Sequence, residues 1–150
     1  MKTIKLISII IMSLFYIGVG IAHFIIPEKF LIIIPPSFPF PLVLVYVSGF
    51  FEILFGILLL LKRWRFYVGI GLIMLLISVF PANIFLYLDE SARQAYGGVS
   101  QNQALVRMCF QIPLILIAYW HSKEFLSKWF NYLCVIISIT TILYFVWILF

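Results

Sequence analysis

Five side chains that could carry chemistry lie in otherwise apolar segments of this sequence: His23, Glu52, Asn83, Arg107 and Gln111. An ionisable group inside a membrane span is costly, so such residues normally face the interior of a helix bundle and have a partner. At about 1.5 Å of rise per residue, all five fall in the outer half or at the centre of their segments. The sequence therefore predicts one polar cluster, with nothing comparable in the cytoplasmic half.

This cluster has two interpretations. In the first, Glu52 and Arg107 form a buried ion pair that fixes helix register, and Asn83 and Gln111 satisfy the remaining hydrogen bonds. In the second, the residues line a small outward-facing pocket that binds a polar or quinone-like headgroup. Five polar groups exceed what a single ion pair needs, which favours the pocket.

The composition dictates the elements that must position these residues. Hydrophobic residues make up 65% of the 150 positions and charged residues 10%, against about 45–50% and about 25% in soluble proteins. A chain of 17.5 kDa with a mean hydropathy of +1.22 cannot bury that much apolar surface in water. The composition therefore predicts a membrane protein and excludes a soluble enzyme, a secreted disulfide scaffold and a nucleic-acid-binding module.

Five segments are apolar enough to be transmembrane helices, because a span needs roughly 20 residues. The predicted helices are residues 4–26, 42–61, 66–88, 104–121 and 131–150. We predict a single all-α transmembrane domain over residues 1–150. Its core is a four-helix bundle within residues 1–121, and residues 125–150 add a C-terminal transmembrane helix.

The bundle core is predicted from the faces of the first four helices, each of which carries small and polar residues. Small residues allow close helix approach, and those expected at helix contacts are Gly20, Ser48, Gly49 and Gly56. The fifth helix offers only Cys134, Ser138 and Thr141 on one side, so we expect it to pack outside the core. The same small-residue faces would permit an oligomer.

Orientation follows from the distribution of Lys and Arg between the spans. The side that carries the N-terminus has Lys2, Lys5, Lys62, Arg63, Arg65, Lys123 and Lys128, and the other side has only Lys29 and Arg93. This bias predicts a cytoplasmic N-terminus, an outer C-terminus and a multi-pass protein of the inner (plasma) membrane. The net charge of +5 is thus a topology signal and not a nucleic-acid footprint. A cleaved signal peptide is the competing interpretation of the first segment, whose apolar run is longer than usual for one.

Two loops are expected on the outer side. Residues 30–34 form a short apolar stretch, and prolines between residues 35 and 41 forbid a continuing helix. This segment is either a short interfacial helix with a stiff cap across the mouth of the bundle or a simple connector. Residues 89–103 are hydrophilic, with Gly97 and Gly98 as the turn.

Several kinds of chemistry are excluded by position. Cys109 and Cys134 differ in depth by about 15–20 Å, too far for a disulfide, and His23 and His121 belong to opposite leaflets, which excludes a bis-histidine haem. No metal-ligand spacing and no catalytic motif occur. We therefore expect no haem, no metal and no independent catalytic activity.

Four short motifs together resemble the DoxX-like membrane proteins. They are GIAHF at residues 20–24, SGFFEILFG at 48–56, FPAN at 80–83 and RMCFQ at 107–111. The resemblance covers about residues 6–121 and implies a four-helix transmembrane core, from which the fifth helix departs. Some relatives are associated with thiosulfate–quinone oxidoreduction, others with methylamine-utilisation maturation, and an animal branch resembles receptor-assembly chaperones.

The resemblance implies two functions by fold-level analogy. The first is an accessory subunit of a membrane redox system whose outer-half pocket binds a small ligand, with a quinone as the cofactor that the family suggests. The second is a non-catalytic assembly factor or chaperone for a partner membrane protein. The expected partners are the lipid bilayer and such a redox or assembly protein, with no nucleic acid and with an oligomer possible. The lack of a cysteine pair argues against the redox-maturation role.

Overall fold

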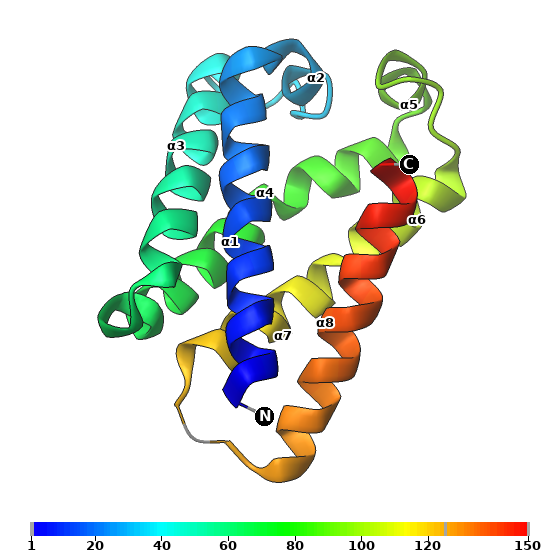
Figure 1. Cartoon of the computed structure of the whole chain (residues 1–150). Helices are drawn as coiled ribbons and strands as arrows, with labels where there is room; N and C mark the ends of the chain where they lie inside the picture. Colours follow the sequence, from blue (N-terminus) through cyan, green and yellow to red (C-terminus); the bar gives the residue numbers. More distant parts are fainter. Residues whose placement is uncertain (1, 125, 150) are drawn as a thin grey trace.

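The structure is a computed structural model that describes residues 2–124 and 126–149, with side chains for residues 3–124 and 126–144. All regular elements in these ranges are helical, which confirms the predicted all-α class (Figure 1). In chain order they are α1 (Lys2–Ile25), α2 (Pro27–Leu31), α3 (Pro41–Leu60), the 3-10 turn η1 (Lys62–Trp64), α4 (Arg65–Leu88), α5 (Glu90–Ala95), α6 (Gln101–Cys109), α7 (Gln111–Ser122) and α8 (Lys128–Leu149).

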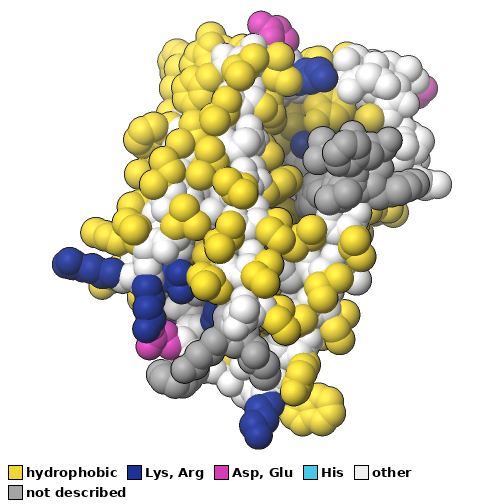
Figure 2. Space-filling model, viewed as in Figure 1, with side chains coloured by type: hydrophobic (Ala, Val, Ile, Leu, Met, Phe, Trp, Pro, Cys, Tyr) yellow, Lys and Arg dark blue, Asp and Glu magenta, His cyan; other side chains and the backbone are white. Residues whose placement is uncertain are grey.

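Among the described residues, four helical segments are long and apolar enough to cross a membrane. They are Thr3–Ile25, Pro41–Leu60, Lys62–Leu88 and Gln101–Ser122, close to the first four predicted spans. Their surfaces are largely apolar, as the space-filling view shows (Figure 2). This is the pattern of helices whose outer faces meet lipid and whose inner faces meet each other.

The fourth of these segments, predicted over residues 104–121, extends over Gln101–Ser122 and contains one interruption. The segment is split at Phe110 into α6 and α7. The physical reason is Pro113, which has no N–H to donate to the carbonyl of Cys109 and whose ring crowds that carbonyl. The helix resumes at once, because the Leu114 N–H donates to the Phe110 carbonyl at 3.2 Å. By contrast, Pro81 lies inside an unbroken α4.

Helices α1 and α3 lie side by side (Figure 1) and touch through their glycines. A Cβ added at Gly49 would lie 2.5 Å from the His23 Cβ, and one at Gly20 would lie 2.7 Å from the Gly49 carbonyl oxygen. A Cβ at Gly56 would lie 2.8 Å from Cγ1 of Ile17. At these distances a Cβ could be added only if a neighbour shifted, so the three glycines lie at the contact of α1 with α3 that the sequence predicts for them. Ser48, predicted for the same contact, lies instead at a cavity described below.

A buried apolar cluster joins α1, α3, α4 and α7. Its members are Ile9, Met12, Tyr16, Leu59, Val68, Leu72, Ile117 and Ala118. Lipid tails are as apolar as these side chains, so in a membrane the cluster is stabilised by close van der Waals packing rather than by removal from water. These four helices therefore share one core.

Helix α8 packs on α7 and, more lightly, on α1 (Figure 1). Trp120 of α7 donates from Nε1 to Oδ1 of Asn131 at 2.8 Å, and the α8 side chains Cys134, Ser138 and Thr141 are buried. The predicted position of this helix, and the face that it buries, agree with these contacts. Helix α8 has 22 residues over Lys128–Leu149. Residues 125 and 150, which bound the predicted C-terminal segment, lie outside the described residues.

The connection between α4 and α6 contains a short helix that was not predicted. Residues 89–103 were predicted as a loop, but α5 occupies Glu90–Ala95. Asp89 caps it by accepting a hydrogen bond from the Ala92 N–H at 2.7 Å, the usual role of an N-cap Asp. The predicted turn at Gly97 and Gly98 is confirmed, because both have positive φ angles of 113° and 75°, which glycine adopts readily.

Candidate functional site: a cavity between α1, α3 and α4

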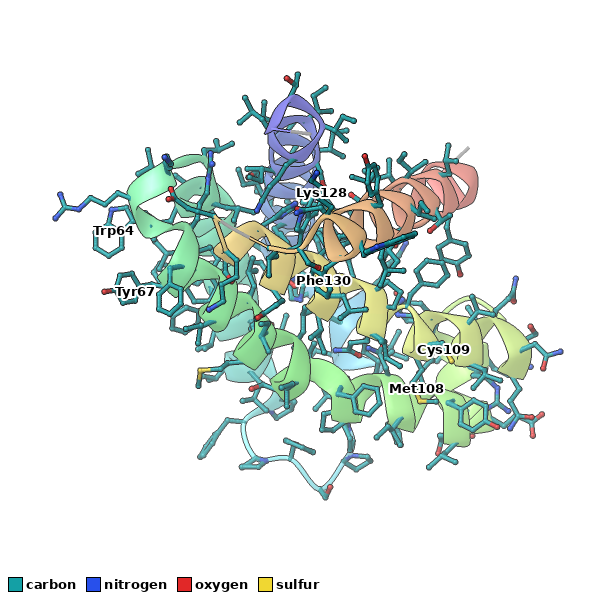
Figure 3. The ribbon with its side chains drawn as sticks, turned by 90° about the horizontal axis from the view of Figure 1, so that it is seen from below. Trp64, Tyr67, Met108, Cys109, Lys128 and Phe130 are labelled. Atoms are coloured by element: carbon teal, nitrogen blue, oxygen red, sulfur yellow. The ribbon has the colours of Figure 1, made fainter. Side chains whose placement is uncertain are left out.

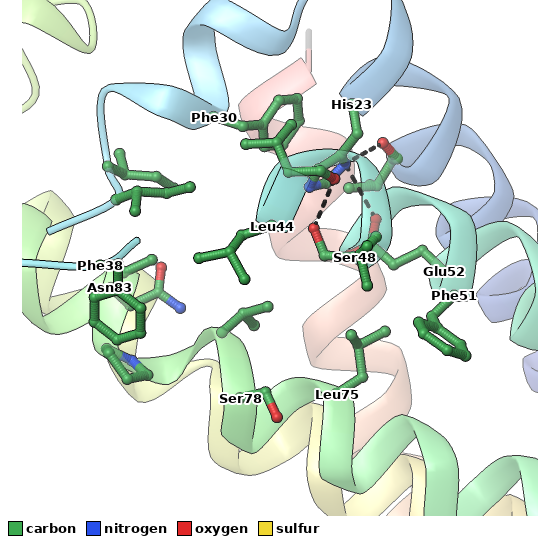
Figure 4. A pocket seen from close by; sticks show the side chains of 18 of the residues that line it. His23, Phe30, Phe38, Leu44, Ser48, Phe51, Glu52, Leu75, Ser78 and Asn83 are labelled. Atoms are coloured by element: carbon green, nitrogen blue, oxygen red, sulfur yellow. Dashed lines mark hydrogen bonds and ion pairs between the residues drawn. The ribbon is translucent and has the colours of Figure 1, made fainter. Parts of the chain in front are cut away.

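A cavity of about 500 Å³ lies between α1, α3 and α4, covered on one side by α2 and the segment after it (Figure 4). Four residues of the predicted polar cluster line it: His23, Glu52, Asn83 and Arg107. The fifth, Gln111, is buried beside the cavity and contacts it only through Asn83. These residues therefore surround one cavity, where they form two groups that do not contact each other.

The first group is His23 and Glu52, at the contact of α1 with α3. Nδ1 of His23 lies 3.3 Å from Oε2 of Glu52 and 2.9 Å from the carbonyl oxygen of Val19. The imidazole also stacks on Phe30 of α2, with ring centroids 3.6 Å apart. Because Gly49 has no side chain, α3 can approach His23 closely enough to place Glu52 beside it.

The carboxyl of Glu52 is only partly satisfied. Its Oε2 atom is buried, and no described residue forms a hydrogen bond of good geometry with it. The His23 ring is its ion-pair neighbour, yet the ring nitrogen that faces it also serves the Val19 carbonyl. A buried acceptor without a donor costs about 1–3 kcal/mol, and this oxygen can accept a hydrogen bond from a further donor.

The second group is a chain of hydrogen bonds from α6 to α4. Arg107 donates from Nε to Oδ1 of Asn83 at 3.1 Å, and Asn83 donates from Nδ2 to Oε1 of Gln111 at 2.8 Å. Gln111 in turn donates to the carbonyl of Leu76. Arg107 also donates from Nη1 to the hydroxyl of Tyr96 at 2.5 Å, and its guanidinium lies over that ring.

The interpretation in which Glu52 and Arg107 form an ion pair is therefore wrong. Within the described part of the chain, Glu52 has His23 as its ion-pair partner, whereas Arg107 bonds to Asn83 and Tyr96. The reason is helix arrangement: α6 packs on α4, and α1 packs on α3 across the cavity. Tyr96 was not predicted, since a single tyrosine in a polar loop gives no pattern from which to place it.

Most of the cavity wall is apolar and aromatic. The proline-rich connection between α2 and α3 contributes Ile33, Ile34, Pro35 and Phe38 to it, which agrees with a cap over the mouth rather than a simple connector. Figure 4 shows Phe30 and Phe38 near the two polar groups and Leu75 on the floor of the cavity. Phe51 and Phe55 of α3 complete the aromatic lining.

Two serine hydroxyls add acceptors to this wall. Ser48 donates to the Val45 carbonyl at 2.9 Å, and Ser78 donates to the Met74 carbonyl at 2.8 Å. Both protons are committed to the backbone of their own helices, so the oxygen lone pairs remain for a ligand donor. Ser78 was not predicted, because serines that bond within a helix are common in membrane spans and carry no distinguishing spacing.

A second buried polar cluster lies nearer the N-terminal end of α1. Ser8 Oγ lies 3.0 Å from Nε2 of His121 and 2.6 Å from the hydroxyl of Ser138, all three being buried. The sequence predicted no polar cluster in the half of the bundle where α1 begins, and that expectation is wrong. The cluster escaped prediction because hydropathy treats serine as nearly neutral, and only packing of α8 on α1 brings Ser138 to Ser8.

The two cysteines lie in different helices, α6 and α8. Cys109 is exposed and Cys134 is buried, and both are free thiols. No group of three His, Cys, Asp or Glu side chains among the described residues is arranged to hold a metal ion. The cavity can therefore offer hydrogen bonds, an aromatic wall and a carboxyl–imidazole pair.

Fold and cavity together define a class: an all-helical protein with four described helices long and apolar enough to span a membrane, and with a polar-edged cavity between them. Residues 12–122 match the family described as Domain of unknown function (DUF8561), and the chain belongs to this family. No curated protein and no solved structure matches the chain.

Proposed function

We propose that this protein is a DoxX-like integral protein of the inner membrane whose cavity binds a small amphipathic ligand, and that it acts as an accessory subunit of a membrane redox system. One observation carries the proposal: a cavity of about 500 Å³ is apolar over most of its wall and polar at two separate places. Small-molecule sites usually have about 300–1,000 Å³ and combine an apolar lining with a few placed polar groups.

A quinone is the first candidate ligand, and the resemblance to the DoxX-like proteins is what suggests it. A quinone is a flat ring with carbonyl acceptors on opposite edges and an apolar tail. Arg107 has N–H donors beyond the two that serve Asn83 and Tyr96, and Phe30 and Phe38 offer faces for the ring. Met74 lines the cavity and is also 64% exposed on α4, so a tail can leave through the lipid-facing surface.

The same proposal assigns an orientation. The end at which α1 begins would be cytoplasmic, since Lys and Arg gather there, and the cavity would then open in the outer half of the membrane. Helix α8 would be a fifth span, because its 22 residues reach about 33 Å at the helical rise. Seen from that end (Figure 3), Trp64 and Tyr67 point outward from the bundle, as interfacial aromatic residues do.

Ligand binding is tested with the full-length protein purified in dodecylmaltoside and titrated with decyl-ubiquinone. We expect Glu52→Gln and Leu75→Trp to weaken binding at least about tenfold. Glu52→Gln removes the carboxylate that holds the His23 ring, the donor at that end of the cavity for the second quinone carbonyl, and Leu75→Trp fills cavity space; either loss costs about 1.5–3 kcal/mol. The matched controls are Glu90→Gln on the exposed face of α5 and Ile70→Trp on the exposed face of α4.

If both the Glu52→Gln and the Leu75→Trp variant bind decyl-ubiquinone with wild-type affinity, the proposed ligand site is wrong. If decyl-ubiquinone binding is unaffected while the cellular level of a co-purifying membrane protein falls in these variants, the assembly-factor function replaces it.

The orientation is tested by labelling whole cells with a membrane-impermeant maleimide. In a Cys109→Ser, Cys134→Ser background, Gln94→Cys in α5 should be labelled in intact cells and Ser127→Cys only after lysis. The reverse pattern would invert the proposed topology, and labelling of both in intact cells would show that the spans are miscounted.

A further inference from the structure

A second hollow, of about 780 Å³, lies at the end of the bundle where α1 begins. Among the described residues, five cationic side chains line it together with a single carboxylate, that of Glu124. The cations are Lys5, Lys62, Arg63, Arg65 and Lys123, and we call this the basic groove. Figure 2 shows Lys and Arg side chains gathered at that end of the visible face.

The cations of the basic groove converge from separate parts of the chain, and two of them are held by hydrogen bonds to the backbone. Lys5 of α1 donates to the carbonyl of Lys123, after α7, at 2.5 Å. Arg65 donates from Nε to the Leu59 carbonyl at 3.1 Å and from Nη2 to the Leu60 carbonyl at 3.3 Å. A topology signal needs only positive charge in each loop; it does not require that the loops bring the charges into one groove.

The charge in the groove is far from balanced. Glu124 accepts from Lys62 at 2.9 Å, and that contact holds the pKa of Glu124 below its usual value, so the carboxylate is charged at neutral pH. Arg63 has no hydrogen-bond or ion-pair partner among the described residues, and Lys123 lies over the Phe66 ring at 5.0 Å. Gathering like charges this way costs free energy unless an anion neutralises them.

The groove also has an apolar side. Leu6, Ile9 and Phe66 line it beside the cations, and Leu6 and Phe66 are exposed on the surface that would meet lipid. A free inorganic anion would gain nothing from contact with these apolar side chains. An anion that carries acyl chains would lie with its headgroup on the cations and its chains along Leu6 and Phe66.

We propose that the basic groove is a binding site for the phosphate headgroup of an anionic phospholipid, such as cardiolipin or phosphatidylglycerol. Arg and Lys hold phosphate oxygens through charge-assisted hydrogen bonds, and basic pockets between helices at the cytoplasmic surface suit such headgroups. The groove shares no lining residue with the cavity near Glu52, so this site stands or falls separately from ligand binding there.

The test is native mass spectrometry of the delipidated full-length protein in detergent, with tetraoleoyl cardiolipin and dioleoylphosphatidylcholine as probes. We expect cardiolipin to bind at least about tenfold more tightly, and the Lys62→Gln, Arg63→Gln double variant to lose about 10- to 30-fold of that affinity, from the usual contribution of each cation near a membrane surface. Lys62 has a largely exposed side chain, so the folded bundle should persist, which circular dichroism checks.

The matched control is Lys29→Gln, Lys128→Gln, which removes the same charge outside the groove. It should keep wild-type cardiolipin affinity. The proposal is overturned if the control loses as much affinity as the groove variant, or if both lipids bind equally well. It is also overturned if inorganic phosphate displaces cardiolipin at comparable concentration, because the site would then recognise a free anion and not a lipid.

Discussion

His23 and Glu52 face each other where α1 meets α3, with the imidazole Nδ1 3.3 Å from the carboxylate Oε2. Their side chains belong to helices whose contact is set by Gly20 and Gly49, so the pair depends on backbone approach rather than on long, flexible side chains. The pair also holds the loop over the cavity, because His23 stacks on Phe30 of α2. The contact of α1 with α3, the pair of His23 with Glu52 and the position of α2 over the cavity therefore depend on one another.

This arrangement predicts energetic coupling between the two residues. In a double-mutant cycle of His23→Phe and Glu52→Gln, the free energies of unfolding should be non-additive by about 0.5–3 kcal/mol, as for residues in direct contact. Phenylalanine keeps the stacking surface for Phe30 and removes the ring nitrogens. The measurement is the unfolding free energy in mixed micelles of dodecylmaltoside and SDS. The control cycle pairs His23→Phe with Glu90→Gln and should be additive; equal coupling in both cycles would contradict the contact.

The glycine contact makes its own prediction. Gly49→Ala should destabilise the protein by about 1–3 kcal/mol, the usual cost of overpacking, because the new Cβ would meet the Cβ of His23 at 2.5 Å. Gly18→Ala on the same pair of helices meets nothing within 4 Å. It should be neutral or stabilise by about 0.5–1 kcal/mol, the helix preference of alanine over glycine. If the two alanine variants unfold alike, α1 and α3 are not packed as described.

The hydrogen bonds from Arg107 through Asn83 to Gln111 predict a loss of stability of similar size when they are broken. Gln111→Leu removes the acceptor for the Asn83 amide and the donor to the Leu76 carbonyl. The buried polar atoms then lack hydrogen-bond partners, which should lower the free energy of unfolding by about 1–3 kcal/mol. Gln101→Leu changes an exposed glutamine at the start of α6 and should alter the unfolding free energy little. A Gln111→Leu protein as stable as the wild type would show that the chain of hydrogen bonds does not form.

Much of this architecture could be predicted from the sequence, because hydropathy and proline position report directly on helices in lipid. The ends of the predicted spans lie within about three residues of the observed helices. His23, Glu52, Asn83 and Arg107, placed at similar depth by the sequence, line one cavity. Rise per residue gives depth but not the direction in which a helix faces its neighbours. For that reason the sequence paired Glu52 with Arg107, and only the packing of α6 on α4 separates them.

The features that could not be predicted depend on tertiary contacts of weakly marked residues. Ser8 and Ser138 are far apart in the chain and have no motif, yet they lie 2.6 Å apart. Tyr96 meets Arg107 only because α5 and the turn after it fold back over α6. A proline such as Pro113 marks a break in helical hydrogen bonding in the sequence, but whether a helix kinks or divides there depends on its neighbours.

The contact between Lys62 and Glu124 gives a prediction that depends on pH. The pKa of Glu124 is lowered by the hydrogen bond and the charge of Lys62. A lowered pKa in the folded state favours folding above the ordinary carboxyl pKa, and that preference is lost as the pH falls through the lowered value. Lys62→Gln should therefore raise the pKa of Glu124 toward its usual range, seen in the carboxyl ¹³C shifts of selectively labelled glutamate. Lys29→Gln is the control and should leave it unchanged; a shift of equal size there would show that only net charge matters.

The docking of α8 is tested through the burial of Cys134. In a Cys109→Ser protein, Cys134 is the single thiol, and it is fully buried between α8 and its neighbours. Ser138→Val removes the hydrogen bond to Ser8 at 2.6 Å, which should cost about 1 kcal/mol and so raise the rate of maleimide labelling about fivefold. Thr140→Val makes a similar exchange on the exposed face of α8, where the hydroxyl bonds only its own helix. Equal labelling rates in the two variants would mean that the hydrogen bonds among Ser8, His121 and Ser138 do not hold α8 to the bundle.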